Sequence, residues 1–146
     1  MSRTKLEDIV SYVETKLNTV SNLDTVKYTD SDNEPIPVKT YGAQIYFDPT
    51  NFFNQEFQYI GKFATEFWKL KVDIIINKRF KDRESVSNSL GVSYWIDTIR
   101  ALFEFGQNVT MFRNSWWELE SLDPKSSTDG YLLKGVFQCE ILNNYN

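Results

Sequence analysis

The sequence predicts an α+β domain in which a mostly antiparallel sheet of about four to five strands carries two amphipathic helices. Two segments have apolar residues at three- and four-residue steps, as on one face of a helix, and several others alternate apolar with polar residues, as in a strand. The strand-like segments follow one another through turns, which favours antiparallel pairing. The 146 residues are enough for a single domain, 1–146, with one ordinary core.

The first helix is predicted close to the N-terminus. Thr4 and Glu7 have the T-x-x-E spacing of a capping box, in which each side chain satisfies a backbone N–H at the start of a helix. The apolar residues around them recur at helical steps and form one stripe: Leu6, Ile9, Val10, Val13, Leu17 and Val20. This stripe must pack against another apolar surface.

Residues 23–49 predict two extended segments around a polar turn at residues 30–34. Pro35 and Pro37 confine the start of the second segment to a sheet edge or a strand end, because proline cannot donate a hydrogen bond to a neighbouring strand. Gly42 suggests a bulge. The acidic residues of the turn either bind a cation or only solvate the turn, and we favour solvation because acidic turns are common.

The next stretch, TNFFNQEFQYIGKF at residues 50–63, is rich in aromatic residues but has neither a helical nor a strand period. Two interpretations remain open. The aromatic side chains either fill the core beneath a loop or form an exposed surface that a partner covers. In the second case Phe52, Phe53 and Phe57 belong to an interface.

A long strand is predicted from Phe67 to Asn77. Alternation divides its residues between an apolar face with Trp68, Leu70, Val72, Ile74 and Ile76 and a polar face with Lys69, Lys71, Asp73 and Asn77. Ile75 breaks the pattern, because it points to the polar face. Burial of Ile75 therefore requires a second layer, which is either a helix or another subunit.

A dense charge cluster follows this strand, in which Lys78, Arg79, Lys81 and Arg83 surround Phe80. Such a cluster can be a solvated loop, can contact a nucleic-acid backbone, or can form a rim of salt bridges to an acidic neighbour. The formal net charge of −4 and the acidic residues inside the cluster argue against nucleic-acid binding. The solvated loop and the interface rim both stay open.

The second helix is predicted between this cluster and Gly106. Ser85 or Ser87 caps its start, and Gly106 is placed to end it. The apolar residues at helical steps are Leu90, Trp95, Ile99, Leu102 and Phe103. They predict a second stripe that packs on the sheet.

Two strands, residues 109–122 and 131–142, are predicted after the second helix, with a turn rich in Pro, Ser, Asp and Gly between them. One face of the last strand carries Leu133, Phe137, Cys139 and Ile141. Trp116 and Trp117 are adjacent in the preceding strand, so they point to opposite faces of the sheet. Burial of both requires cover on each face, as for Ile75.

The sequence offers few residues for catalysis. It has no histidine, which removes the commonest general base, and its single cysteine, Cys139, cannot form an internal disulfide. No glycine-rich loop opens a helix as a phosphate cradle does. We therefore predict no catalytic residue, no metal site and no cofactor. The N-terminus lacks the apolar core of a signal peptide and no segment could span a bilayer, which predicts synthesis as a soluble intracellular protein.

The order of these segments resembles a known family. A capped amphipathic helix, two extended segments, a long strand, a central helix with YWIDTIRALFEF and a closing strand with GVFQCEIL resemble the tail-terminator, or tail-completion, proteins of long-tailed bacteriophages. The resemblance covers nearly the whole chain and lies in its organisation rather than in one motif. Residues 50–63 have no counterpart in the family pattern.

The resemblance implies a virion structural protein of the tail or neck that is assembled in the host cytoplasm. Such a protein forms a hexameric ring on the last ring of the tail tube protein, stops tube growth, and presents a surface to the head-connector or neck protein. It implies an α+β fold whose sheet lines or supports the ring while the helices pack outside. DNA passes through the lumen without sequence-specific contact, and no catalytic residue is implied.

Aromatic residues make up 16% of the chain, which suits either an aromatic core or an interface. The alternative function is a small α+β ligand-binding domain or enzyme with an aromatic pocket, in which Asp73 or Glu118 is the polar handle. The candidate interface residues for the ring hypothesis are Phe52, Phe53, Phe57, Ile75, Lys78, Arg79, Lys81, Arg83, Trp116 and Trp117.

Overall fold

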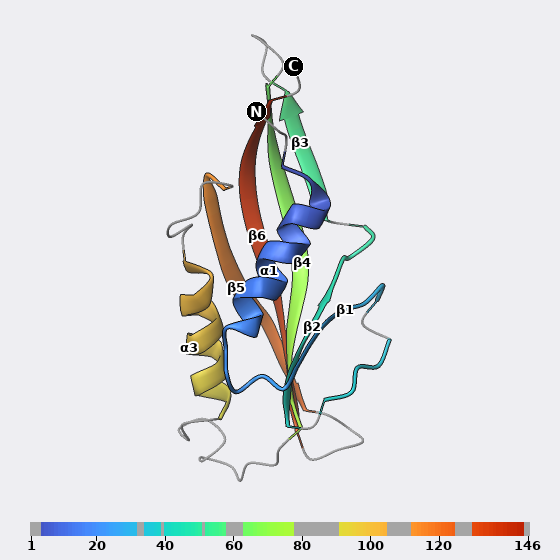
Figure 1. The fold of residues 1–146 in the computed structure, drawn as a ribbon, viewed down its shortest axis with the longest axis vertical. Helices are drawn as coiled ribbons and strands as arrows, with labels where there is room; N and C mark the ends of the chain where they lie inside the picture. Colours follow the sequence, from blue (N-terminus) through green and yellow to red (C-terminus); the bar gives the residue numbers. More distant parts are fainter. Residues whose placement is uncertain are drawn as a thin grey trace.

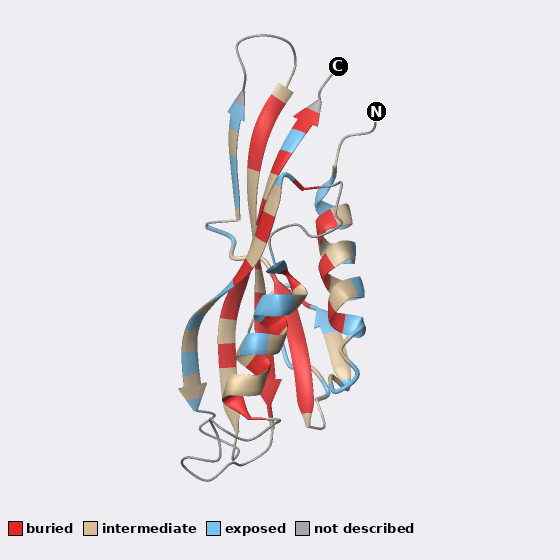
Figure 2. Cartoon of the chain, turned by 90° about the vertical axis from the view of Figure 1, so that its left-hand side faces the viewer, coloured by how far each residue is buried: buried red, intermediate tan, exposed pale blue. Residues whose placement is uncertain are grey.

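The part of the chain that the structure describes forms one open, six-stranded sheet with two helices on one of its faces (Figures 1 and 2). This computed structural model describes residues 4–31, 34–38, 40–50, 52–57, 63–77, 91–104, 112–124 and 130–144. In chain order the elements are α1 (Leu6–Asn18), β1 (Thr25–Tyr28), β2 (Tyr41–Tyr46), β3 (Phe53–Phe57), β4 (Phe63–Ile76), α3 (Val92–Leu102), β5 (Asn114–Pro124) and β6 (Tyr131–Asn144).

The strand order across the sheet is β1-β2-β4-β6-β5, and β3 pairs with β4 beyond the end of β2. Neighbouring strands are antiparallel except β1 and β2, which are parallel. The predicted α+β class and the mostly antiparallel sheet are therefore confirmed, but the described residues form six strands rather than four to five. The additional strand is β3, which lies in the aromatic stretch where the sequence shows no strand period.

β4 is the long central strand and has partners along both of its edges. On one edge β6 runs opposite β4 from its first residue to its last. On the other edge β2 pairs with residues 71–76 and β3 pairs with residues 64–68. β2 and β3 are thus two parts of one interrupted strand, and residues 47–52 lie between them.

The two helices bury their apolar stripes against the central strands. The buried helical side chains are Ile9, Val13 and Leu17 on α1 and Val92, Trp95 and Ile99 on α3. They form one core with residues of β4 and β6 that include Leu70, Ile74, Leu133, Phe137, Cys139 and Ile141. The rings of Tyr12 and Phe112 lie 4.9 Å apart in this core, and those of Phe103 and Phe137 lie 5.1 Å apart. Part of the aromatic content therefore fills the core.

The start of α1 is tied to the last strand. Lys5 rather than Thr4 is the N-cap, and the Lys5 N–H donates to Asp8 Oδ2 at 2.8 Å, so the predicted capping box is wrong by one residue. The Thr4 N–H instead donates to Asn143 Oδ1 at 2.9 Å, and the Thr4 carbonyl accepts from Asn143 Nδ2 at 3.1 Å. Asn143 Nδ2 also donates to Glu66 Oε2 at 2.9 Å. The N- and C-termini consequently lie at the same end of the sheet (Figure 1).

α3 has Gly91 as its N-cap and ends before Phe103. Trp95 and Ile99 are buried as predicted, and Phe103 is buried directly after the helix. The predicted capping serines, the basic cluster and Gly106 lie outside the described residues. Neither of the two described helices has the length and apolar character that a membrane crossing requires.

The connection between the parallel strands β1 and β2 covers part of the second face of the sheet. Gln44 Nε2 donates to the backbone carbonyls of Glu34 and Ser31, at 2.7 and 3.2 Å, and Asn77 Nδ2 donates to the Val38 carbonyl at 2.9 Å. We call the described residues of this connection, 29–31 and 34–38, segment 29–38. Val38 leaves no room for a Cβ atom at Gly42. The register between β2 and β4 runs through Gly42 without a shift, so the predicted bulge is wrong and close packing accounts for the glycine.

Ile75 lies under this crossover. It is opposite Gly42 of β2 and Leu132 of β6, and its side chain is 8% exposed in the single chain. The second layer that Ile75 requires is therefore segment 29–38, a crossover between parallel strands where the sequence suggested a turn. No other subunit is needed to bury Ile75.

Trp117 joins three strands at the middle of the sheet. Its indole Nε1 donates to the Val72 carbonyl of β4 at 3.2 Å, across the intervening strand β6. The ring lies on Gly135, where a Cβ atom would collide with it. A register shift in β5 between Leu119 and Ser121 lies beside this crossing point. Trp117 is 4% exposed and faces the helices.

We expect Ile75→Ala to lower the free energy of unfolding of the isolated chain by about 2 to 5 kcal/mol, because it removes buried apolar atoms from beneath segment 29–38. Urea unfolding monitored by tryptophan fluorescence measures the loss. Lys69→Ala, a truncation on the same face of β4, is the matched control and should cost less than about 1 kcal/mol. A loss for Ile75→Ala no larger than that of the control would contradict burial within the chain.

Gly135→Ala should destabilise the chain by about 1 to 3 kcal/mol, because the new methyl group collides with the Trp117 indole. In a Trp117→Ala background the same substitution should be nearly neutral. A double-mutant cycle of unfolding free energies therefore gives a coupling of the same size as the single loss. An equal cost of Gly135→Ala with and without the indole would show that this contact is not the cause.

Candidate interaction surfaces

The face of the sheet opposite the described helices carries polar side chains in its middle. The side chains on this face bond to one another: Lys71 to Glu120, Gln138 Nε2 to Glu118 Oε2 at 2.9 Å, and Arg113 Nη1 to Glu140 Oε1 at 3.5 Å. Exposed pairs of this kind add little to stability. This surface is therefore a solvated face of the sheet, in contrast to the region that segment 29–38 covers.

One carboxyl group, that of Asp73, is buried beneath this polar face. Its side chain is 1% exposed, and it accepts hydrogen bonds from the Tyr46 hydroxyl at 2.7 Å and from the Gly135 N–H at 3.3 Å. Burial raises the pKa of Asp73 to about 6, although both hydrogen bonds and the charges of Lys134 and Lys71 act in the opposite direction. Asp73 thus links β4 to β2 and β6.

A groove of about 790 Å³ lies between α3 and β5 at one edge of the sheet. We call it the α3–β5 groove; its lining is Ile96, Asp97, Arg100, Ala101 and Glu104 from α3 and its C-terminal end, and Asn114, Trp116, Trp117, Glu118 and Leu119 from β5. β5 is the last strand in the sheet order, so its outer edge pairs with no other described strand. The groove therefore combines a helix face with an unpaired strand edge.

The α3–β5 groove has an apolar floor and a mostly acidic rim. Ile96 and Leu119 are half-buried apolar side chains, and the exposed charged residues of α3 and its C-terminal end are Asp97, Arg100 and Glu104. Two carboxylates thus face one guanidinium. Trp116 and Glu118 line the groove from β5, but they pair with Gln138 and Val136, so their side chains point to the polar face of the sheet, where Glu118 accepts from Gln138. Sequence patterns indicated Trp116 and missed the α3 side of the groove, although Ile96, an apolar residue outside the buried stripe of the helix, was a usable signal.

The edge of the sheet that lies away from β5 carries a row of aromatic rings, which we call the aromatic edge. Ring centroids are 6.2 Å apart for Tyr28 and Phe47, 5.6 Å for Phe47 and Phe52, 6.1 Å for Phe52 and Trp68, and 4.3 Å for Phe53 and Trp68. Tyr28 and Phe53 are each 41% exposed. These residues come from β1, β3, β4 and the interruption between β2 and β3, so the structure joins aromatic residues from distant parts of the sequence.

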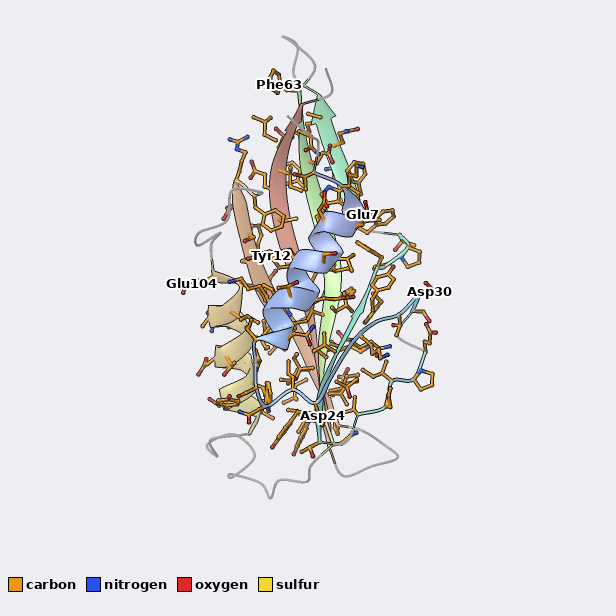
Figure 3. All side chains as sticks on the ribbon, in the orientation of Figure 1. Glu7, Tyr12, Asp24, Asp30, Phe63 and Glu104 are labelled. Carbon is orange, nitrogen blue, oxygen red and sulfur yellow. The ribbon has the colours of Figure 1, made fainter. Side chains whose placement is uncertain are left out.

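The predicted interface residues are thus divided between two separate places. Phe52 and Phe53 lie in the aromatic edge, and Trp116 lies in the α3–β5 groove, whereas Ile75 and Trp117 are buried by the chain itself. The Phe57 side chain and the four basic residues Lys78, Arg79, Lys81 and Arg83 lie outside what the structure describes. The sheet order places the groove and the aromatic edge on opposite sides (Figure 3, where Glu104 and Asp30 mark these sides).

The described residues do not bring catalytic groups together. Cys139 is buried, and burial raises the pKa of its thiol to about 12, so the reactive thiolate is not formed near neutral pH. No group of three or more potential metal ligands occurs among the described residues. The two carboxylates of the alternative function are also apart, because Asp73 is inside the sheet and Glu118 lines the groove.

Asp73→Asn should remove a pH-dependent contribution to stability. The folded-state pKa of about 6 lies above the ordinary value of 3.8, so the folded protein binds this proton more tightly than the unfolded chain. The stability of the wild type relative to Asp73→Asn should therefore fall by about 3 kcal/mol as the pH rises from about 4 to about 6, and stay level above. Urea unfolding of both proteins across this range measures the difference. Equal pH slopes for the two proteins would contradict the assignment.

Comparisons with known proteins assign the chain to no family. No model of a known protein family matches the sequence, and no curated protein matches it. A function for this chain is therefore argued from its own surfaces and from the family resemblance in the order of its elements.

Proposed function

We propose that this chain is a virion structural protein of a long-tailed phage, a tail terminator that closes into a ring and joins the tail tube to the head connector. The observation that carries the proposal is the pair of unlike surfaces on opposite sides of one open sheet. The α3–β5 groove has an apolar floor with an acidic rim, and the aromatic edge exposes large rings.

Unlike surfaces on opposite sides are what a head-to-tail ring requires. In such a ring the same two patches meet at each contact, one from each neighbour, and the ring closes when the rotation between neighbours divides a full turn. A two-fold dimer instead needs one self-complementary patch. Two unlike edges therefore favour cyclic assembly over a simple dimer, and the hexameric number comes from the family resemblance.

The arrangement of layers supports the same proposal. Both described helices lie on one face, which suits the family pattern of helices outside and a sheet that lines or supports the ring. The polar face would then be turned toward the lumen. Its described side chains carry both signs of charge and several of them bond to one another, so it would offer DNA a hydrated surface of mixed charge.

The end of the sheet that carries the termini is a candidate docking surface for one of the axial partners. There β3, β4 and β6 extend beyond the helices (Figure 1), and Leu142 of β6 is 44% exposed. The tail tube protein and the head-connector or neck protein would contact opposite rims of the ring. Virion localisation in the tail or neck follows from these contacts.

The second candidate is a ligand-binding domain, and the volume of the α3–β5 groove is the observation that favours it. A volume of about 790 Å³ lies in the range of small-molecule sites. An apolar ligand that binds in the groove of the folded chain would raise its melting temperature, and the rise would increase with the ligand concentration. A panel of apolar dyes that leaves the melting temperature unchanged would remove this candidate.

The ring proposal predicts that the purified chain forms closed rings, alone at high concentration or on isolated tail tubes. Native mass spectrometry gives the subunit number, and electron microscopy shows whether a ring sits on the tube end. A strict monomer at a concentration of about 10⁻⁴ M, far above ordinary assembly affinities, that also leaves tube ends uncapped would reject the function.

Removal of the exposed rings, Tyr28→Ser with Phe53→Ser, should reduce the ring fraction at least about tenfold while far-UV circular dichroism stays that of the folded chain, because apolar interface anchors are lost. Leu142→Ser is the matched control. Leu142 has a similar exposure but lies on a central strand, so lateral ring contacts should persist. Equal ring fractions for the double variant and the wild type would exclude the aromatic edge from the contact.

A further inference from the structure

The α3–β5 groove has the shape and charge of a binding site for an extended basic segment. We propose that, within the proposed ring on which this inference rests, the groove of one chain receives a second copy of the same chain through residues 78–83 of that copy. The groove would thereby be one half of the lateral contact, and the basic cluster would act together with the aromatic edge in the other half.

The walls of the groove suit a peptide rather than a compact ligand. One wall is the exposed side of α3 and the other is β5, whose outer edge pairs with no other described strand. A free strand edge offers backbone N–H and C=O groups to an incoming extended segment, and side-chain pockets beside it supply the specificity. The half-buried side chains of Ile96 and Leu119 provide such a pocket.

Charge complementarity selects the occupant. The exposed rim on α3 and its C-terminal end has Asp97 and Glu104 against a single Arg100. The most basic segment of the chain is KRFKDR at residues 78–83, in which four cations flank one phenylalanine. An aromatic anchor fits an apolar floor, and cations at the rim of an interface steer association with an acidic partner. This match rests on the amino-acid composition of residues 78–83.

The decisive experiment exchanges charges between the two halves. In the groove variant Asp97→Lys is combined with Glu104→Lys, and in the segment variant Arg79→Glu is combined with Lys81→Glu. Each variant alone should lose rings at least about tenfold, because like charges then face one another at every contact. An equimolar mixture should recover rings, since each altered groove meets an altered segment and each unaltered groove meets an unaltered one.

The control for the charge change is Glu7→Lys. Glu7 is an exposed carboxylate on α1, outside both the α3–β5 groove and the aromatic edge, so its reversal should leave the ring fraction within about twofold of the wild type. Loss of rings in the two charge variants without recovery in the mixture would overturn the proposal, because the altered groups would then not face one another across two chains.

A peptide measurement separates this inference from the ring itself. A peptide of residues 77–83 should quench or shift the tryptophan fluorescence of the full chain at low salt, and the groove variant should weaken its binding at least about tenfold. Replacing the phenylalanine of the peptide by alanine should weaken binding by a similar factor.

The combined outcomes are distinguishable. Rings that form equally well in the wild type and in both charge variants would overturn the groove inference and leave the ring function standing. Peptide binding at the groove by a chain that never forms rings would reject the ring function and leave the groove as a site for basic segments. Absence of both peptide binding and charge-dependent assembly would overturn the inference.

Discussion

The rest of the structure depends on the pairing of β4 with β6. These two strands run opposite one another over the full length of β4. Both helices pack on them, β2, β3 and β5 pair with them, and β1 is joined to them through β2. Two buried side chains stabilise the middle of this strand pair. Asp73 accepts a hydrogen bond from the Gly135 N–H, and the Trp117 indole N–H donates one to the Val72 carbonyl. A local change at this point would act on four strands together.

The length of this central strand pair determines which strand edges of the sheet are left without a partner strand among the described residues. Each partner strand is shorter or interrupted, so β5 ends the sheet on one side, while β1 and β3 end it on the other. Soluble proteins usually protect such edges with charges, bulges or covering segments. Among the described residues one edge carries exposed aromatic rings and the other lies beside a groove, which fits the proposal that both edges contact partners.

The sequence predicted those parts of the fold that periodicity encodes. The helical stripes and the alternation in β4 and β6 gave the helices, the long strands and their buried faces. It could not give the parallel crossover, because nothing local distinguishes a turn at residues 30–34 from a connection that folds over Ile75. The sequence of β3 likewise has no strand period. Hydrogen bonds to β4 and the packing of Phe53 on Trp68 hold this strand in the sheet, and neither is visible in the local sequence. The groove could not be predicted from the sequence, because only the fold places Ile96 of α3 beside the strand that carries Trp116.

The polar character of the groove is consistent with ring assembly on energetic grounds. A closed ring contains one more contact than an open chain of the same subunits, and that last contact forms without a further loss of free translation. In the proposed ring each lateral contact could therefore be weak alone, as a small half-buried floor with a charged rim would make it. A larger apolar patch would make such a ring independent of the tube and would expose the free subunit to aggregation. A weak, charge-matched contact would instead leave the tail tube end as the place where the proposed ring closes.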